Sequence, residues 1–138
     1  MSKIYVVDDE RTIADTLVAI LNRNGYQSTG FYSAEDALIA CSDAAPDALI
    51  TDVMMPGMGG VELAMRMRRT YPNCRILMFS GNASTFDILE NVRKEGQDFE
   101  LLLKPVHPRE LLERLNVIPG IRGGMPPGSG PFGPQRAM

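Results

Sequence analysis

Residues 3–25 read KIYVVDDERTIADTLVAILNRNG, a stretch that joins a strand pattern to a helix pattern. The first five residues are mostly β-branched or aromatic, a composition that favours a strand. After the acidic pair Asp8-Asp9, apolar residues return at the spacing of one helix face, namely at Ile13, Leu17, Ile20 and Leu21. Asn24-Gly25 then predicts the end of the helix. The stretch therefore predicts a β-α unit whose strand is followed by two carboxylates.

The same alternation continues along the chain. Strand patterns cover residues 26–31, 47–52, 75–80 and 99–103. Helix patterns follow them from Ser33, which forms a capping pair with Asp36, over residues 61–71, over residues 84–94 and from Pro108. Five β-α units predict the α/β class, with helices on both faces of a parallel sheet. The expected fold is a doubly wound, flavodoxin-like sheet of five strands in the order 2-1-3-4-5, with five helices.

The composition is that of one globular domain. The chain has 138 residues, of which 44% are hydrophobic and 22% are charged, enough apolar material for a single core. Its formal net charge is -3, so it lacks the basic excess of a dedicated nucleic-acid binder. The longest apolar runs are too short to span a membrane, and the acidic N-terminal segment does not resemble a signal peptide. We therefore expect a cytoplasmic protein without direct nucleic-acid or membrane partners.

The last part of the sequence differs from the rest. Gly and Pro fill 11 of the 20 positions from residue 119 to residue 138. Such a segment cannot bury enough apolar surface to offset the entropy that it would lose on ordering. We expect residues 1–118 to form the domain and residues 119–138 to be a disordered tail or a truncated linker. The chain is then either a stand-alone protein or part of a longer one.

Polar residues end four of the five predicted strands. Asp8 and Asp9 follow the first strand, Asp52 ends the third, Ser80 ends the fourth and Lys104 follows the fifth. In open α/β sheets the functional crevice lies at the carboxyl ends of the strands, so we expect these side chains to meet there. Three clustered carboxylates repel one another unless a cation is present, and their oxygens suit Mg²⁺. The sequence therefore predicts a magnesium site at this edge. The alternative is that Lys104 alone pairs with one acid and that the other acids are solvated.

The same residues carry a family resemblance. They are the acidic pair in VVDDE, the acid in LITDVMMPGMGG, the hydroxyl in LMFSG and the Lys-Pro pair in LLLKPV. In their order, spacing and strand placement, residues 3 to about 116 resemble the CheY-like receiver domain of response regulators in two-component signalling. The resemblance implies a phosphorylation-controlled switch rather than a turnover enzyme. It also implies a sensor histidine kinase or phosphotransfer protein as the donor, and a downstream protein of unknown identity as the target.

The resemblance also assigns a role to each polar side chain. Asp52 would accept the phosphoryl group. Lys104 would pair with the phosphoryl oxygens, and the Ser80 hydroxyl would move onto them. The peptide bond before Pro105 would be cis, because that isomer is common at this position in the family. The ligands of Mg²⁺ would be Asp9, Asp52, the backbone carbonyl of Met54 and, partly through water, Asp8.

One position departs from the family pattern. Receivers commonly carry Tyr or Phe three residues before the lysine, where this chain has Leu101, so the usual aromatic switch is in doubt. Phe99 has the same side-chain parity along the strand and is an alternative to it, although packing is the simpler role. Met54 and Asn82 occupy positions that tune the lifetime of the phosphoryl group in this family. Because Met54 is apolar and cannot orient a water, slow self-dephosphorylation is expected, unless both residues only fill loop space.

The remaining candidates have weaker support. His107 is the only histidine, which argues against Ser-His-Asp, Cys-His and multi-histidine metal sites, and we expect it beside a helix start. Cys41 and Cys74 lack metal or redox spacing and are expected in the core. An aspartyl-phosphate phosphohydrolase would need a second acid at the position of Met54. The main alternative is a constitutive protein-binding module of receiver fold that works without phosphorylation.

Overall fold

The computed structural model describes residues 2–81, 90, 93 and 99–116. Along the chain they form β1 (Lys3–Val7), α1 (Arg11–Arg23), β2 (Gln27–Phe31), α2 (Ala34–Asp43), β3 (Ala48–Asp52), α3 (Gly60–Thr70), β4 (Arg75–Ser80), β5 (Glu100–Leu103) and α5 (Pro108–Asn116). These include four of the five expected helices. The helix expected over residues 84–94 and the tail expected from residue 119 lie outside the described residues. None of the described helices is long and apolar enough to cross a membrane.

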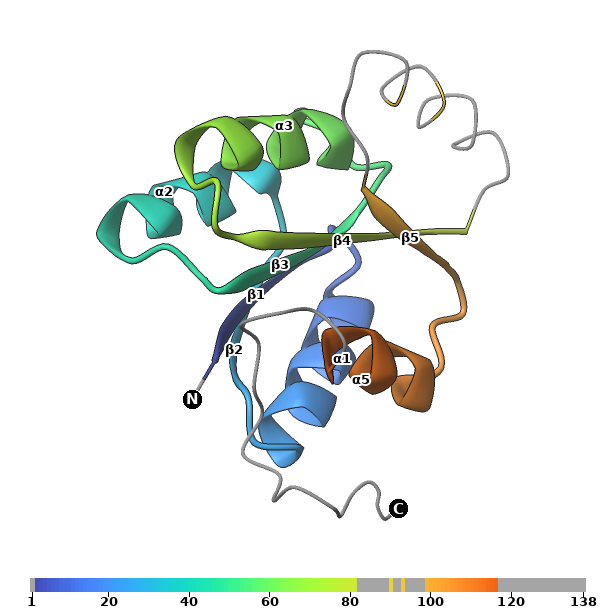
Figure 1. The fold of residues 1–138 in the computed structure, drawn as a ribbon. Helices are drawn as coiled ribbons and strands as arrows, with labels where there is room; N and C mark the ends of the chain where they lie inside the picture. Colours follow the sequence, from blue (N-terminus) through green and yellow to red (C-terminus); the bar gives the residue numbers. More distant parts are fainter. Residues whose placement is uncertain (1, 82–89, 91–92, 94–98, 117–138) are drawn as a thin grey trace.

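The five strands form one parallel sheet in the order β2-β1-β3-β4-β5, which confirms the expected topology. In the register of this sheet, Asp52 of β3 lies beside Phe79 of β4. Ser80 of β4 in turn lies beside Leu103 of β5. Because all strands run in the same direction, the carboxyl ends of β1, β3, β4 and β5 meet at one edge of the sheet (Figure 1).

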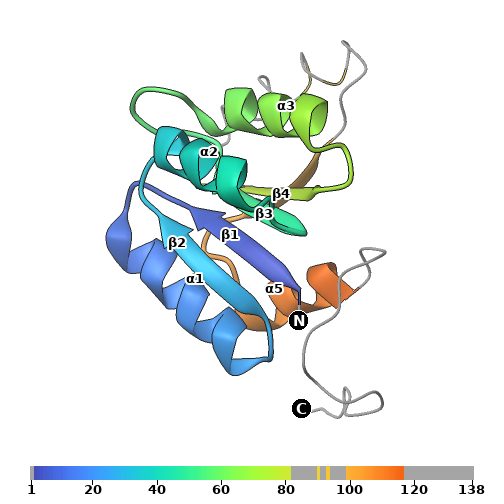
Figure 2. The same ribbon diagram turned by 90° about the vertical axis from the view of Figure 1, so that its left-hand side faces the viewer.

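Helices cover both faces of the sheet. Figures 1 and 2 show α1 and α5 on one face and α2 and α3 on the other. Residues of β1 alternate between the two cores: Ile4 and Val6 pack on the α1 and α5 side, whereas Tyr5 and Val7 pack on the α2 and α3 side. The central strand β3 is buried along its whole length, as expected of a parallel strand covered on both faces. The architecture is therefore doubly wound.

Local contacts fix the starts of two helices. The Ser33 hydroxyl, just before α2, accepts a hydrogen bond from the backbone N–H of Asp36 at 3.1 Å, which confirms the predicted capping pair. Just before α5, His107 Nδ1 accepts a hydrogen bond from the backbone N–H of Arg109 at 3.1 Å. The histidine therefore lies at a helix start, as the sequence predicts.

Both cysteines are buried thiols. Cys41 of α2 lies with its Sγ 3.6 Å from Met67 Sδ of α3, in the contact between the two helices. Burial raises the pKa of Cys41, and burial together with the nearby Cys41 and Asp47 raises the pKa of Cys74 to about 12. Thiols with such raised pKa values are weak nucleophiles at neutral pH. The structure therefore supports the packing role predicted for the cysteines.

Candidate functional site

Four strands bring polar side chains to the carboxyl edge of the sheet. Asp8 follows β1, Asp52 ends β3, Ser80 ends β4 and Lys104 follows β5. The exposed fraction is 0% for Asp8, 6% for Asp52 and 1% for Ser80, while Asp9 is exposed beside them. Burying polar groups is costly unless they are paired or bound. Their concentration at one edge therefore marks a functional site.

Lys104 faces several carboxylates of this site. Its Nζ donates a hydrogen bond to Asp52 Oδ2 at 2.9 Å and lies 3.3 Å from Asp8 Oδ2. The same Nζ lies 3.8 Å from Glu10 Oε1, a contact that the sequence reasoning missed. The position of Glu10 directly after the acidic pair is equally typical of a helix start, so it gave no signal for this contact. One ammonium group thus forms ion pairs with three carboxylates, and two of these belong to buried residues.

Contacts with Ser80, Gly81 and Phe79 position the Lys104 side chain at the carboxyl edge of the sheet. Its backbone N–H donates to the carbonyl of Ser80 at 2.8 Å, which continues the pairing of β4 with β5. Its aliphatic stem passes Gly81, where an added Cβ would lie 3.6 Å from Lys104 Cδ. Its Nζ lies 5.1 Å from the centre of the Phe79 ring, a cation-π distance. The peptide bond between Lys104 and Pro105 is cis.

The three aspartates form the acidic part of the site. One carboxylate oxygen from each of Asp8, Asp9 and Asp52 lies within 4.8 Å of the other two. Asp8 Oδ1 accepts a hydrogen bond from the backbone N–H of Glu10 at 2.9 Å. Asp8 Oδ2 is buried and accepts no hydrogen bond from the described residues, so Lys104 reaches it only as an ion pair. A buried carboxylate oxygen without a donor, inside a cluster of hard oxygen ligands, fits a cation such as Mg²⁺.

The electrostatic environment disfavours the charge on Asp8. Burial raises the pKa of its carboxyl and Asp52 adds to the rise, while the Glu10 N–H and Lys104 oppose it without cancelling it. For Lys104, burial lowers the pKa, but the hydrogen bond and charge of Asp52 and the charge of Asp8 raise it by more. Lys104 therefore keeps its proton. Its single positive charge does not neutralise the acidic cluster, so a second cation would be favoured there.

The loop after β3 lies against the site. The backbone N–H of Met54 donates to Asp52 Oδ1 at 3.3 Å, and the Met54 residue is 54% exposed. At the end of the loop, the N–H of Gly60 donates to the carbonyl of Val53 at 2.9 Å. An added Cβ on Gly60 would overlap the carbonyl oxygen of Asp52. Only glycine therefore lets α3 begin this close to the aspartate.

The strand register places Leu101 away from the acids. Leu103 of β5 pairs with Ser80, and Leu101 pairs with Met78, two residues further from the carboxyl edge. The Leu101 side chain is half-buried and packs into the core on the α2 and α3 side. Position 101 therefore lies beside β4, the strand that carries Ser80, but its leucine side chain has no aromatic ring.

Phe99 lies further still from Ser80. It precedes β5 and is buried in the core on the α2 and α3 side. The guanidinium carbon of Arg68 lies 4.7 Å from the centre of its ring. Each residue along a strand adds about 3.3 Å, so Phe99 is more distant from the serine than Leu101 is. This position agrees with the packing role. Asn82, the other residue expected to tune hydrolysis, lies outside the described residues.

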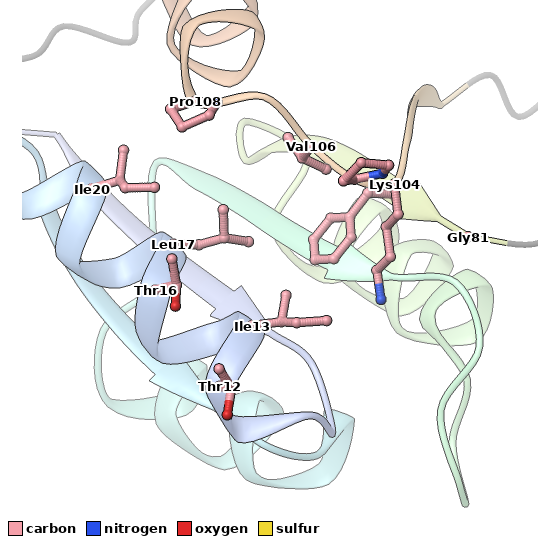
Figure 3. Close-up of a pocket in the computed structure, with 11 residues that line it drawn as sticks. Thr12, Ile13, Thr16, Leu17, Ile20, Gly81, Lys104, Val106 and Pro108 are labelled. Atoms are coloured by element: carbon pink, nitrogen blue, oxygen red, sulfur yellow. The ribbon is translucent and has the colours of Figure 1, made fainter.

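An apolar pocket adjoins the site (Figure 3). Its volume is about 660 Å³, and it lies between α1 and the segment from Lys104 to Pro108. Figure 3 shows Ile13 and Ile20 of α1 on one side of the pocket and Val106 on the other. The sequence reasoning missed this pocket because its two sides come from opposite ends of the domain.

Comparison with known proteins gives consistent matches. A family model described as the response regulator receiver domain matches residues 4–116. The DNA-binding response regulator MtrA of Mycolicibacterium paratuberculosis is 29% identical over 115 residues, which are 83% of this chain and 50% of MtrA. The chain thus spans half the length of this curated relative.

Solved structures agree with the family match. A response regulator receiver domain protein from Clostridium thermocellum superposes with a TM-score of 0.76 at 28% identity, over 84% of this chain and 92% of that one. The chemotaxis protein CheY4 of Vibrio cholerae gives 0.73 at 31% identity, over 84% and 97% of the two chains. TrrA of Thermotoga maritima, solved in complex with Mg²⁺-BeF, gives 0.73 at 28% identity, over 84% and 97%. The chain therefore belongs to the response regulator receiver domain family.

Proposed function

We propose that this chain accepts a phosphoryl group on Asp52 from a phosphohistidine protein, in a step that needs Mg²⁺, and that this change alters its binding to a partner. Receiver domains are signalling switches rather than turnover enzymes, which agrees with this role. The observation that carries the proposal is the position of Asp52. Its carboxylate accepts a hydrogen bond from Lys104 and lies beside the carboxylates of Asp8 and Asp9, at the end of a buried strand.

The arrangement suits nucleophilic attack on phosphorus. An Asp52 oxygen would form the new P–O bond, the P–N bond to the donor imidazole would break, and the imidazole would keep the electron pair. Such a transfer spreads negative charge over the phosphoryl oxygens, so positioning and positive charge matter most. Lys104 already hydrogen-bonds Asp52 and would turn its Nζ to the new oxygens.

The acidic cluster would hold the metal. Its ligands would be Asp8, Asp9, Asp52 and the backbone carbonyl of Met54. Mg²⁺ bound there would supply positive charge to the phosphoryl oxygens and relieve the repulsion among the carboxylates. The buried Oδ2 of Asp8, which accepts no hydrogen bond from the described residues, supports this assignment.

The signal would leave the site through β4. The Ser80 hydroxyl is buried at the end of this strand and would donate to a phosphoryl oxygen, drawing the following residues toward Asp52. Because position 101 is a leucine, this chain would transmit the change through the segment after Ser80 rather than by turning an aromatic ring. The apolar side chain of Met54 would leave hydrolytic water unoriented, which gives the phosphorylated form a long lifetime.

The donor would be a sensor histidine kinase or a phosphotransfer protein. We assign its docking to the pocket between α1 and residues 104–108, which is largely apolar and adjoins the lysine of the site. The downstream target would be another protein. We expect this partner to bind instead of nucleic acid, because a formal net charge of -3 leaves no basic excess to pair with phosphates. MtrA, which is described as DNA-binding, is twice as long as the region that matches this chain. We place the domain end near residue 118, before the Gly- and Pro-rich segment, and the protein in the cytoplasm.

Phosphorylation is tested directly by intact mass. The full chain is incubated with acetyl phosphate, once with Mg²⁺ and once with EDTA, and Asp52→Asn serves as the control. One added phosphoryl group that is absent in EDTA and in the variant is the expected result. A folded protein that binds Mg²⁺ and gains no phosphoryl group would instead support a constitutive binding module.

A further inference from the structure

Glu35 links α2 to the loop that follows the phosphoacceptor strand. It lies in the first turn of α2, far in sequence from the loop of residues 53–59. Its Oε2 accepts a hydrogen bond from the backbone N–H of Met58 at 3.3 Å. An acidic side chain in the first turn of a helix interacts favourably with the helix dipole, so the position suits a glutamate.

The loop is shaped to receive this carboxylate. Gly57, just before Met58, has a positive φ of 74°, which turns the chain and is readily adopted only by glycine. An added Cβ on Gly57 would lie 3.0 Å from Glu35 Oε2. The carboxylate therefore rests against the bare backbone of Gly57 while it accepts the Met58 N–H.

The contact adds a polar tie to a loop whose ends are held by backbone hydrogen bonds and whose Met55 and Met58 side chains pack against the core. At one end, Met54 N–H donates to Asp52 Oδ1. At the other end, Gly60 N–H donates to the Val53 carbonyl. The Glu35 contact falls between these two points, at the outer part of the loop. Fixing this part restricts the orientations open to the Met54 peptide group, which stands beside the phosphoacceptor.

We propose that Glu35 is a positioning residue for the metal and phosphoacceptor site, acting through the loop of residues 53–59. The inference rests on the proposed function, because it assumes that the Met54 carbonyl and Asp52 bind Mg²⁺. Glu35 touches neither the acids nor the phosphoryl group. It holds the Gly57–Met58 turn, and thereby holds Met54 in the orientation that the site needs.

The experiment compares three variants of the full chain. Glu35→Ala removes the acceptor, and Glu35→Gln keeps an oxygen that can accept the Met58 N–H. Glu62→Ala is the matched control, because it removes one negative charge from an exposed side chain of α3 that pairs only with Arg66 among the described residues. The readouts are the Mg²⁺ dissociation constant by calorimetry, the rate of phosphorylation by acetyl phosphate and the unfolding temperature in EDTA.

Glu35→Ala is expected to weaken Mg²⁺ binding and slow phosphorylation by about fivefold, the effect of one hydrogen bond of ordinary strength. Glu35→Gln is expected to restore both values to within about twofold, and Glu62→Ala to change neither. The unfolding temperature in EDTA should stay within about 2 °C of the parent, because the contact is exposed. That stability readout separates positioning of the site from a general loss of structure.

Parent-like Mg²⁺ binding by Glu35→Ala would overturn the proposal. A Glu35→Gln variant as weak as Glu35→Ala would also overturn it, because the hydrogen bond would then not be what matters. Failure of the proposed function looks different: the parent itself would gain no phosphoryl group. In that case the Mg²⁺ titration still decides whether Glu35 positions the loop.

Discussion

Lys104 Nζ lies 2.9 Å from Asp52 Oδ2 and 3.3 Å from Asp8 Oδ2, so that one ammonium group bridges the ends of β1 and β3. Lys104 itself follows β5. In the parallel sheet β1 lies next to β3, and only β4 separates β3 from β5. The contact is therefore a product of the strand order. It places the only described cation of the site where incoming phosphoryl oxygens would need one.

Replacing this lysine should slow phosphorylation strongly. Lys104→Met keeps the aliphatic stem over Gly81 but removes the charge, and the rate with acetyl phosphate should fall by about a hundredfold. The rate is measured by intact mass over time at saturating Mg²⁺. Arg69→Met removes an exposed positive charge from α3 and should leave the rate unchanged. An unchanged rate in Lys104→Met would contradict the role of the lysine.

Removing the buried acid should stabilise the metal-free protein. The raised pKa of Asp8 means that its ionised form at pH 7 is less favourable in the folded chain than in the unfolded chain. Asp8→Asn should therefore raise the unfolding temperature in EDTA by a few degrees and reduce the stabilisation that Mg²⁺ gives the parent. Both are read from thermal unfolding with and without Mg²⁺.

Asp9→Asn is the matched comparison for Asp8→Asn. Asp9 contributes an oxygen to the same cluster but is exposed, so it has no burial cost to relieve. This variant should lose Mg²⁺ stabilisation without becoming more stable in EDTA. If Asp8→Asn gains no stability over the parent in EDTA, the argument from burial is wrong.

The start of α3 should tolerate no side chain at residue 60. An alanine there would drive its Cβ into the carbonyl oxygen of Asp52, so Gly60→Ala should destabilise the fold by about 3 kcal/mol. The measurement is the urea unfolding midpoint. Gly59→Ala is the neighbouring control, since its Cβ would lie 3.4 Å from the Val53 carbonyl oxygen, an ordinary contact. Equal midpoints for the two variants would show that the loop adapts freely.

The polar residues of the site could be predicted because each is set by a local pattern. Asp8 and Asp52 stand where a β pattern stops, and parallel strands bring their carboxyl ends together whatever the details of packing. The capping pair at Ser33 and Asp36 is equally local and was confirmed. Three strand limits shifted by one residue: the structure places Tyr26, Asp47 and Phe99, each expected within a strand, just before β2, β3 and β5.

Contacts made by tertiary packing were not predictable in the same way. Glu35 meets the loop only because α2 packs beside the β3–α3 connection, and no period in the sequence points to that neighbour. Glu10 lies in the helix-start pattern, where an acid has an ordinary local explanation, so its approach to Lys104 gave no signal. The pocket beside α1 forms only because residues 104–108 lie opposite that helix. Their position depends on the strand order.

The side chain of Met54 should control the lifetime of the phosphorylated form. It is half-exposed at the site and cannot hold a water, so Met54→Gln should shorten the half-life of the aspartyl-phosphate by about tenfold. Met54→Leu keeps an apolar side chain and should match the parent. The half-life is followed by intact mass after the donor is removed. Equal half-lives for the glutamine and leucine variants would contradict the prediction.

The pocket beside α1 should matter for protein donors and not for small ones. Ile20→Arg places a charge in a largely apolar pocket, so phosphotransfer from a phosphorylated histidine kinase or phosphotransfer protein should slow at least about tenfold. Phosphorylation by acetyl phosphate should be unaffected, because Ile20 is outside the acidic site and that donor needs no docking surface.

The matched control is Ile39→Arg. Ile39 is 67% exposed on α2, which covers the opposite face of the sheet, so the same substitution there should change neither reaction. Comparing the two donors in each variant separates docking from chemistry. Ile20→Arg with a normal rate from the protein donor would show that docking uses another surface, whereas slowing with both donors would show that the substitution distorts the site through Lys104.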